Sequence, residues 1–184
     1  MATAFWIAVG TLAGGAAYWA IRPLVRTYLG YRGTRVVTCP ETRAAAAVVV
    51  DAAFAAMSHA SLGSPALRLS GCSRWPDRQG CGQECLAEIE AAPEACLVRT
   101  IVERWYRGRT CGFCRRPFGD IRWADHKPAL RAPDGETVQW SELRAEELPA
   151  VFTTHSPVCW TSHITETFRR RHPELVVEGR PARP

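Results

Sequence analysis

Two pairs of soft metal ligands lie far apart in this sequence. Cys111 and Cys114 form a C-x-x-C pair, and Cys159 and His163 form a C-x-x-x-H pair. Turn-forming residues surround the first pair, and a spacing of four places the second pair on one face of a helix. Three thiolates and one imidazole are the ligand set of a closed structural zinc site. The sequence therefore predicts one zinc site at Cys111, Cys114, Cys159 and His163.

Other uses of the cysteines remain open. Eight cysteines could form disulfides in a secreted chain, or could be buried thiols that pack as small hydrophobic side chains. Neither use accounts well for a C-x-x-C pair followed by a cysteine and a histidine four residues apart, so we favour metal binding. Cys96 lies beside the apolar stripe of a predicted helix, and we expect an inert buried thiol there.

A second group of thiols lies in the first half of the chain. Cys72, Cys81 and Cys85 are close in sequence, and glycines on both sides of Cys81 allow a turn. Cys39 follows a predicted strand and is the natural fourth ligand. Four thiolates suit either zinc or an iron-sulfur cluster, and their spacing does not separate the two. The sequence predicts a second metal site here, with the cluster as the alternative to a second zinc ion.

The chain begins with an apolar segment. No charged side chain occurs from Ala2 to Ile21, and about twenty helical residues span a hydrocarbon core of about 30 Å. Trp6 and Trp19 lie near the two ends, where aromatic side chains favour the headgroup region. A signal peptide would carry a basic region before the apolar run, and none is present. We therefore expect a single uncleaved transmembrane helix over 1–22.

Basic residues follow this segment and none precedes it. Four arginines lie directly after it: Arg22, Arg26, Arg32 and Arg35. By the positive-inside rule we expect a single-pass protein of the inner membrane, with its N-terminus outside and its C-terminal domain in the cytoplasm. A reducing cytoplasm keeps thiols free for metal and disfavours structural disulfides.

Composition limits the partners. The net charge is +5, and the arginines after the apolar segment supply most of it, which argues against nucleic-acid binding. Gly10 and Gly14 have the G-x-x-x-G spacing that lets two helices pack closely in lipid. We expect the lipid bilayer and a protein partner as contacts, with self-association through Gly10 and Gly14 as a further contact.

The remaining pattern predicts an α+β protein: the N-terminal transmembrane helix, then a small cysteine-rich soluble domain with short β-hairpins and helices around the metal sites. The predicted divisions are an anchor over 1–22, a basic juxtamembrane segment over 23–35, a cysteine-containing α+β part over 36–107, a zinc-binding part over 108–175 and a flexible tail over 176–184. Extended patterns predict strands at 35–39, 48–50, 66–70, 120–123 and 137–140. Apolar periodicity predicts helices at 94–106 and 160–171, and a capped short helix at 142–147 that ends at Pro149.

The order of elements from about 110 to 172 resembles a treble-clef or zinc-ribbon-like module. Cys111 and Cys114 match the knuckle of that module, a hairpin follows, and Cys159 and His163 match the first turn of its helix. An N-terminal anchor before a cysteine-rich domain also resembles uncharacterised bacterial membrane proteins. Neither resemblance implies an activity.

We expect a non-catalytic role, as a scaffold or accessory subunit for a membrane-associated partner, because a closed zinc site has no vacancy for substrate. Electron transfer by an iron-sulfur cluster is the first alternative. Thiol redox chemistry at Cys111 and Cys114 is less favoured because redox C-x-x-C motifs open a helix. Haem attachment is also less favoured, because Ser162 replaces the second cysteine of C-x-x-C-H. His126 and His155 are expected to be surface residues.

Overall fold

The computed structural model describes residues 2–75, 77–78 and 80–176, so the predicted tail over 176–184 lies outside the described residues except for Val176. This part of the chain is α+β, with six α-helices and two antiparallel sheets of three strands each. It divides into two compact units, one up to Thr100 and one from Ile101. Each unit contains one of the sheets.

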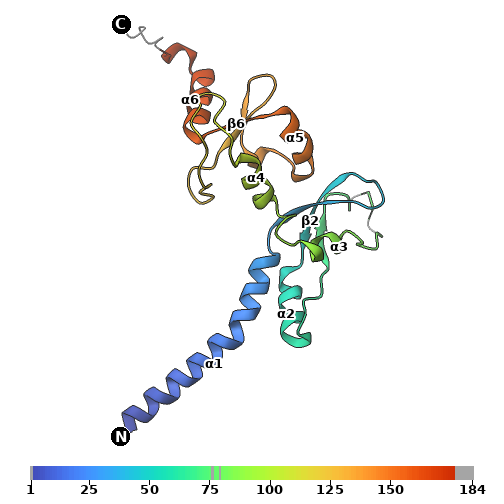
Figure 1. The fold of residues 1–184 in the computed structure, drawn as a ribbon, viewed down its shortest axis with the longest axis vertical. Helices are drawn as coiled ribbons and strands as arrows, with labels where there is room; N and C mark the ends of the chain where they lie inside the picture. Colours follow the sequence, from blue (N-terminus) through green and yellow to red (C-terminus); the bar gives the residue numbers. More distant parts are fainter. Residues whose placement is uncertain (1, 76, 79, 177–184) are drawn as a thin grey trace. The chain divides into compact units, whose positions relative to one another are not determined.

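The first unit begins with helix α1, which runs from Ala2 to Tyr31 (Figure 1). The helix expected at the N-terminus is therefore present, and it continues beyond Pro23 to the first strand. None of the helices in the described part of the chain has both the length and the apolar character that crossing a membrane requires. The prediction of a transmembrane anchor over 1–22 is thus not supported.

The first sheet contains the predicted hairpin of β1 (Thr34–Thr38) and β2 (Ala45–Val50), and β3 (Leu69–Cys72) pairs with β2. The third strand begins at Leu69, later than predicted. Alternating side chains of the strands form the core with residues from α3 (Leu86–Ala91) and the segment after it: Val37, Val48, Val50, Leu69, Ile89 and Cys96. Cys96 is buried as expected.

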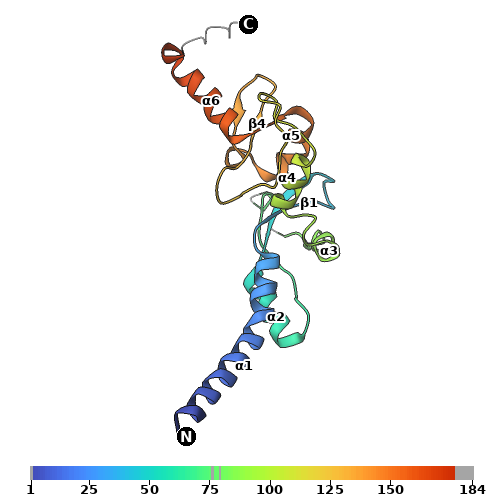
Figure 2. The same ribbon diagram turned by 60° about the vertical axis from the view of Figure 1, so that its left-hand side comes forward.

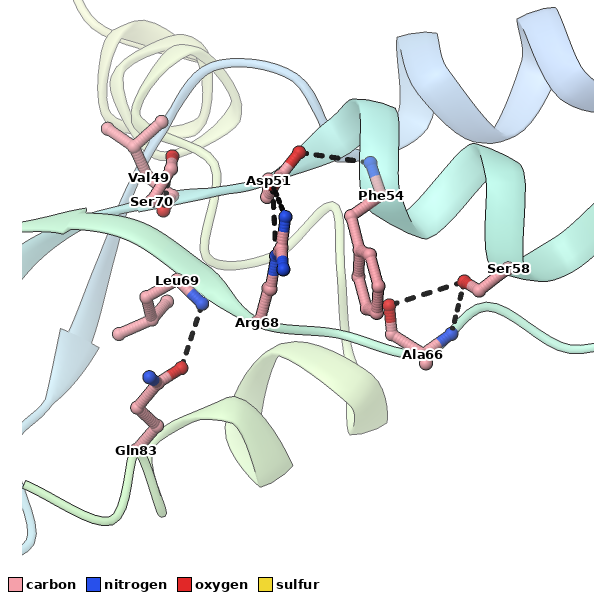
Figure 3. Close-up of polar contacts among 9 residues, drawn as sticks. All are labelled: Val49, Asp51, Phe54, Ser58, Ala66, Arg68, Leu69, Ser70 and Gln83. Atoms are coloured by element: carbon pink, nitrogen blue, oxygen red, sulfur yellow. Dashed lines mark hydrogen bonds and ion pairs between the residues drawn. The ribbon is translucent and has the colours of Figure 1, made fainter.

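Helix α2 (Ala52–Leu62) lies beside α1 in both views (Figures 1 and 2). Polar contacts hold it to the segment before β3 (Figure 3). Asp51 caps its first turn by accepting the Phe54 N–H at 2.9 Å, and it also accepts from Arg68 at 2.7 Å. At the other end, Ser58 Oγ accepts the Ala66 N–H at 2.8 Å.

Arg35 joins the C-terminus of α1 to the first sheet. Its side chain is fully buried, and the guanidinium donates to four backbone carbonyls. These are the carbonyls of Gly30 and Tyr31 at 2.5 Å each, of Gly33 at 3.2 Å and of Pro93 at 3.3 Å. The last carbonyls of a helix have no partner inside the helix. A cation at this end also interacts favourably with the partial negative charge of the helix dipole. Gly33 makes the turn with φ +99°, a conformation that suits glycine. Arg35 is therefore a buried part of the fold, and the basic juxtamembrane segment over 23–35 stays a prediction.

Helix α4 (Val98–Tyr106) is shorter than the predicted helix over 94–106. It starts later because Leu97 forms a β-bridge with Arg35, so the chain is extended at that point. In the second unit, β4 (Ala129–Arg131) lies between β5 (Thr137–Val138) and β6 (Ser156–Val158). Gly135, with φ +88°, lies in the turn of the predicted hairpin. The strand predicted at 120–123 is wrong, because those residues pair with no strand in the described structure.

The segment after β5 also differs from prediction. Two 3₁₀ turns, Trp140–Glu142 and Ala145–Glu147, replace the helix over 142–147, and α5 (Leu148–Thr154) follows them. Pro149 lies in the first turn of α5, where its missing N–H costs nothing, so it begins a helix and does not end one. The predicted last helix is confirmed as α6 (Trp160–Arg171), and a 3₁₀ turn over Pro173–Leu175 follows it.

Aromatic side chains form much of the core of the second unit: Trp105, Tyr106, Phe118, Trp140 and Phe152. The Tyr106 hydroxyl donates to the Ala129 carbonyl at 2.5 Å and accepts from Trp140 Nε1 at 3.2 Å. Burial raises the pKa of Tyr106 well above its usual value, so the phenol is neutral. These bonds hold α4 to the second sheet and position the turn that follows α4.

Replacing Arg35 with alanine should lower the free energy of unfolding by roughly 2–4 kcal/mol, because buried carbonyls would lose their donor. Chemical denaturation of the full chain, followed by circular dichroism, measures the change. The matched control is Arg32→Ala, an exposed arginine at the end of α1, for which a change within about 0.5 kcal/mol is expected. Equal losses in both variants would show that the buried hydrogen bonds are not the source.

Candidate metal centre

The first ligand pair lies on a tight turn that follows α4. Thr110 and Pro117 form an isolated β-bridge at its base. Inside the turn, the Cys111 N–H donates to the Arg116 carbonyl at 2.9 Å, and the Arg115 N–H donates to the Cys111 carbonyl at 3.0 Å. Arg115 has φ +60°, the left-handed conformation that is uncommon for residues other than glycine. The turn therefore holds Cys111 and Cys114, which are three residues apart in the sequence, close to each other in space.

The third cysteine reaches this turn from the other end of the second unit. Cys159 follows β6 and is the N-cap residue of α6. The Gly112 N–H donates to the Pro157 carbonyl at 2.9 Å, and the Cys159 N–H donates to Cys111 Sγ at 3.4 Å. These bonds hold together two segments that lie 48 positions apart in the sequence.

The sulfurs of Cys111, Cys114 and Cys159 form one compact group. All three lie within 4.8 Å of one another, and Cys114 Sγ is 3.7 Å from Cys159 Sγ. Tetrahedral zinc, with Zn–S bonds of about 2.3 Å, places its sulfurs about 3.8 Å apart. Cys111 is buried, Cys159 is half-buried and Cys114 is exposed. The spacing fits one thiophilic metal ion, and the structure confirms that these predicted ligands meet.

Hydrogen bonds favour the thiolate form of Cys111. Burial alone would raise the pKa of Cys111, but the N–H groups of Cys159 and Cys114 and the Ser162 hydroxyl outweigh burial and lower it to about 6. Burial raises the pKa of Cys159, which Ser162 partly offsets. Ser162 Oγ lies 3.5 Å from Cys111 Sγ and 3.3 Å from Cys159 Sγ. A thiolate is the form that binds metal.

Ser162 is the functional residue that sequence reasoning missed. In the sequence, Ser162 was noted only because it stands where the haem-attachment motif C-x-x-C-H has its second cysteine. In the structure, its hydroxyl lies between two of the clustered sulfurs. Residues that hydrogen-bond to metal ligands tune both affinity and ligand orientation. Its position three residues after Cys159 on one helix face is the signal that could have identified it.

His163 is the fourth predicted ligand. It is buried in the first part of α6, but it does not belong to the group of ligand atoms within 4.8 Å of one another. Its Nδ1 is buried and has no hydrogen-bond partner among the described residues. Burial lowers the pKa of its imidazole, which favours the neutral ring. The structure brings the three cysteines together, and coordination by His163 stays a prediction.

The second thiol group lies in the first unit. Cys39, Cys72, Cys81 and Cys85 all line one cavity of about 110 Å³. Their sulfurs are more widely spaced than those of the first group, because the described part of the chain has no cluster of three ligand atoms within 4.8 Å other than the first one. The four cysteines meet at one cavity, and metal binding there stays a prediction.

The remaining candidates lie apart from the sulfur group. His126 is exposed and pairs with Asp125 at 2.6 Å. His155 is half-buried, and its Nδ1 lies 2.8 Å from the hydroxyl of its neighbour Thr154. Neither histidine belongs to the sulfur cluster in the described structure.

Comparisons with protein-family models, with curated proteins and with solved structures found no match. The likeness to a treble-clef module therefore rests on the residues and on the order of elements. That order is present: the Cys111 turn comes first, the β4–β5 hairpin follows, and Cys159 and His163 lie at the start of α6.

Replacing Cys114 with serine should weaken zinc binding by at least about 100-fold, because even residues next to a metal ligand contribute 10–100-fold. The zinc content of the full chain, purified without chelator, measures this. Cys114 is exposed, so the change should leave packing intact. Cys96→Ala is the matched control, because that thiol is buried in the other unit. Equal zinc content in wild type and Cys114→Ser would contradict the site.

Proposed function

We propose that this protein is a zinc-stabilised binding module, a non-catalytic scaffold or accessory subunit that presents its second unit to a partner protein at a membrane. The observation that carries the proposal is the group of three sulfurs, Cys111, Cys114 and Cys159, at the spacing that tetrahedral zinc requires.

His163 completes the ligand set in this proposal. Its imidazole is buried, and Nδ1 has no partner among the residues that the structure describes. A buried polar atom without a partner costs about 1–3 kcal/mol, and metal coordination would remove that cost. The histidine also follows Cys159 by one helical turn, as the closed ligand set of a structural zinc site requires.

A structural role for the metal follows from the architecture of the second unit. Its strands contain only two or three residues each, so the sheet has few hydrogen bonds of its own. A metal bound by the Cys111 turn and by the start of α6 would cross-link segments that are far apart in sequence. Because four protein ligands fill a tetrahedral site, no position remains for substrate.

For α1 we propose contact with a lipid bilayer, with the second unit on the cytoplasmic side. Trp6, Leu12 and Trp19 are 70, 75 and 67% exposed. Exposed apolar side chains of this size gain free energy when lipid covers them. The arginines that follow them, Arg22 and Arg26, would attract anionic headgroups. Packing of two copies through Gly10 and Gly14 would be compatible with this contact.

Removing zinc from the full chain with a chelator should lower the melting temperature of the second unit by roughly 10 °C, because a cross-link of a few kcal/mol is lost. Tryptophan fluorescence reports on Trp105 and Trp140 in that unit. His163→Gln should melt at a lower temperature than wild type and respond less to chelator. Cys114→Ser should not respond at all. A melting temperature that is the same with and without zinc would contradict a structural role for the metal.

Replacing Leu12 with aspartate should reduce binding to vesicles of phosphatidylcholine and phosphatidylglycerol by roughly tenfold or more, because a charge in lipid is costly. Co-sedimentation of the full chain measures binding. Leu175→Asp is the matched control, since Leu175 is a similarly exposed leucine in the second unit. If both variants bind as wild type does, α1 is not a lipid contact.

A further inference from the structure

The four cysteines of the first unit meet at one cavity. Cys39 follows β1, Cys72 ends β3, and Cys81 and Cys85 lie in the loop between β3 and α3. All four are half-buried. Cys39 meets the other three only because β1 and β3 both pair with β2, so the group is more than a local sequence cluster.

The dimensions of this cavity do not suit a single metal ion. A lone tetrahedral zinc ion needs sulfurs about 3.8 Å apart, and among the described residues these four thiols give no group of three within 4.8 Å. The cavity measures about 110 Å³, whereas one water molecule needs roughly 10–15 Å³. The cavity that the four cysteines line therefore has room for a group of several atoms.

Two further side chains of the cavity suit an anionic, sulfur-rich occupant. Trp75 lines it, and the indole N–H of Trp75 is buried without a hydrogen-bond partner among the described residues. Thiolate and sulfide sulfurs accept such hydrogen bonds in iron-sulfur proteins. Arg74 also lines the cavity, and its guanidinium would offset the negative charge of four thiolates.

The geometry points to an iron-sulfur cluster held by Cys39, Cys72, Cys81 and Cys85. In such a cluster the cysteines bind several iron atoms, so their sulfurs spread around the group and lie further apart than around one ion. The apolar part of the cavity wall, which includes Val48 and Leu69, would shield the cluster from water. This centre is separate from the zinc site and does not depend on the proposed function of the second unit.

The test is anaerobic reconstitution of the full chain with ferric iron, sulfide and a thiol reductant, which together supply the ferric and ferrous iron of an oxidised cluster. Wild type should bind iron and inorganic sulfide in equal amounts and acquire visible absorption that bleaches on reduction with dithionite. Cys39→Ser and Cys81→Ser should each lose most of this absorption. These two cysteines lie outside the buried core cluster, so the variants should fold, which circular dichroism checks.

Two controls separate this centre from the first one. Cys96→Ala removes a buried thiol of the same unit that does not line the cavity and should keep the absorption. Cys114→Ser should lose zinc and keep the absorption, so the failure of one site is distinguishable from the failure of the other.

A measurement on wild type does not depend on how any variant folds. After reconstitution, Cys39, Cys72, Cys81 and Cys85 should react with iodoacetamide at least tenfold more slowly than in the metal-free chain, as peptide mass spectrometry measures. Equal reaction rates, iron without sulfide, or a second zinc ion in place of iron would each overturn the cluster.

Discussion

The pairing of the Cys111 turn with the end of β6 is the contact on which the metal centre depends. The bond from the Gly112 N–H to the Pro157 carbonyl brings the two chain segments together, and the bond from the Cys159 N–H to Cys111 Sγ places the third sulfur. The same contacts that position the cysteines also lower the pKa of Cys111. The bond from the Cys159 N–H to Cys111 Sγ therefore acts on both the position and the protonation state of the group.

The first unit depends on a different kind of constraint. The guanidinium of Arg35 satisfies the carbonyls at the end of α1 and that of Pro93, so one buried cation joins the helix, the first strand and the segment after α3. A buried charge is tolerated only where it is hydrogen-bonded, and here the carbonyl dipoles supply the bonds. Arg35 therefore ties the C-terminal end of α1 to the first sheet, while α2 packs along the same helix.

The two groups of thiols differ in a way that composition does not reveal. In the second unit, a tight turn and a helix N-terminus force three sulfurs to within 4.8 Å of one another. In the first unit, four cysteines line a wider cavity that Trp75 and Arg74 also line. A narrow group suits a single ion and a wide one suits a polynuclear group, so the two groups of thiols differ in the kind of metal centre that their geometry suits.

Local signals in the sequence were sufficient for the features that depend on neighbouring residues. The turn at Gly135, the start of α6 after Cys159 and the first hairpin follow from turn residues and periodicity. The C-x-x-C spacing likewise identified Cys111 and Cys114 as candidate metal ligands. Local patterns failed where a distant contact overrode them, as at the start of α4, where Leu97 pairs with Arg35 instead of continuing the helix.

The sequence by itself determined which side chains can bind metal and which short segments they occupy, because spacing and turn chemistry act over a few residues. Only the tertiary structure decided that Arg35 is buried, that Ser162 lies between two sulfurs, and that four cysteines of the first unit share one cavity. These facts depend on segments that meet across tens of residues. Contacts between distant segments depend on the packing and the hydrogen bonding of the whole unit. A short stretch of sequence does not determine them.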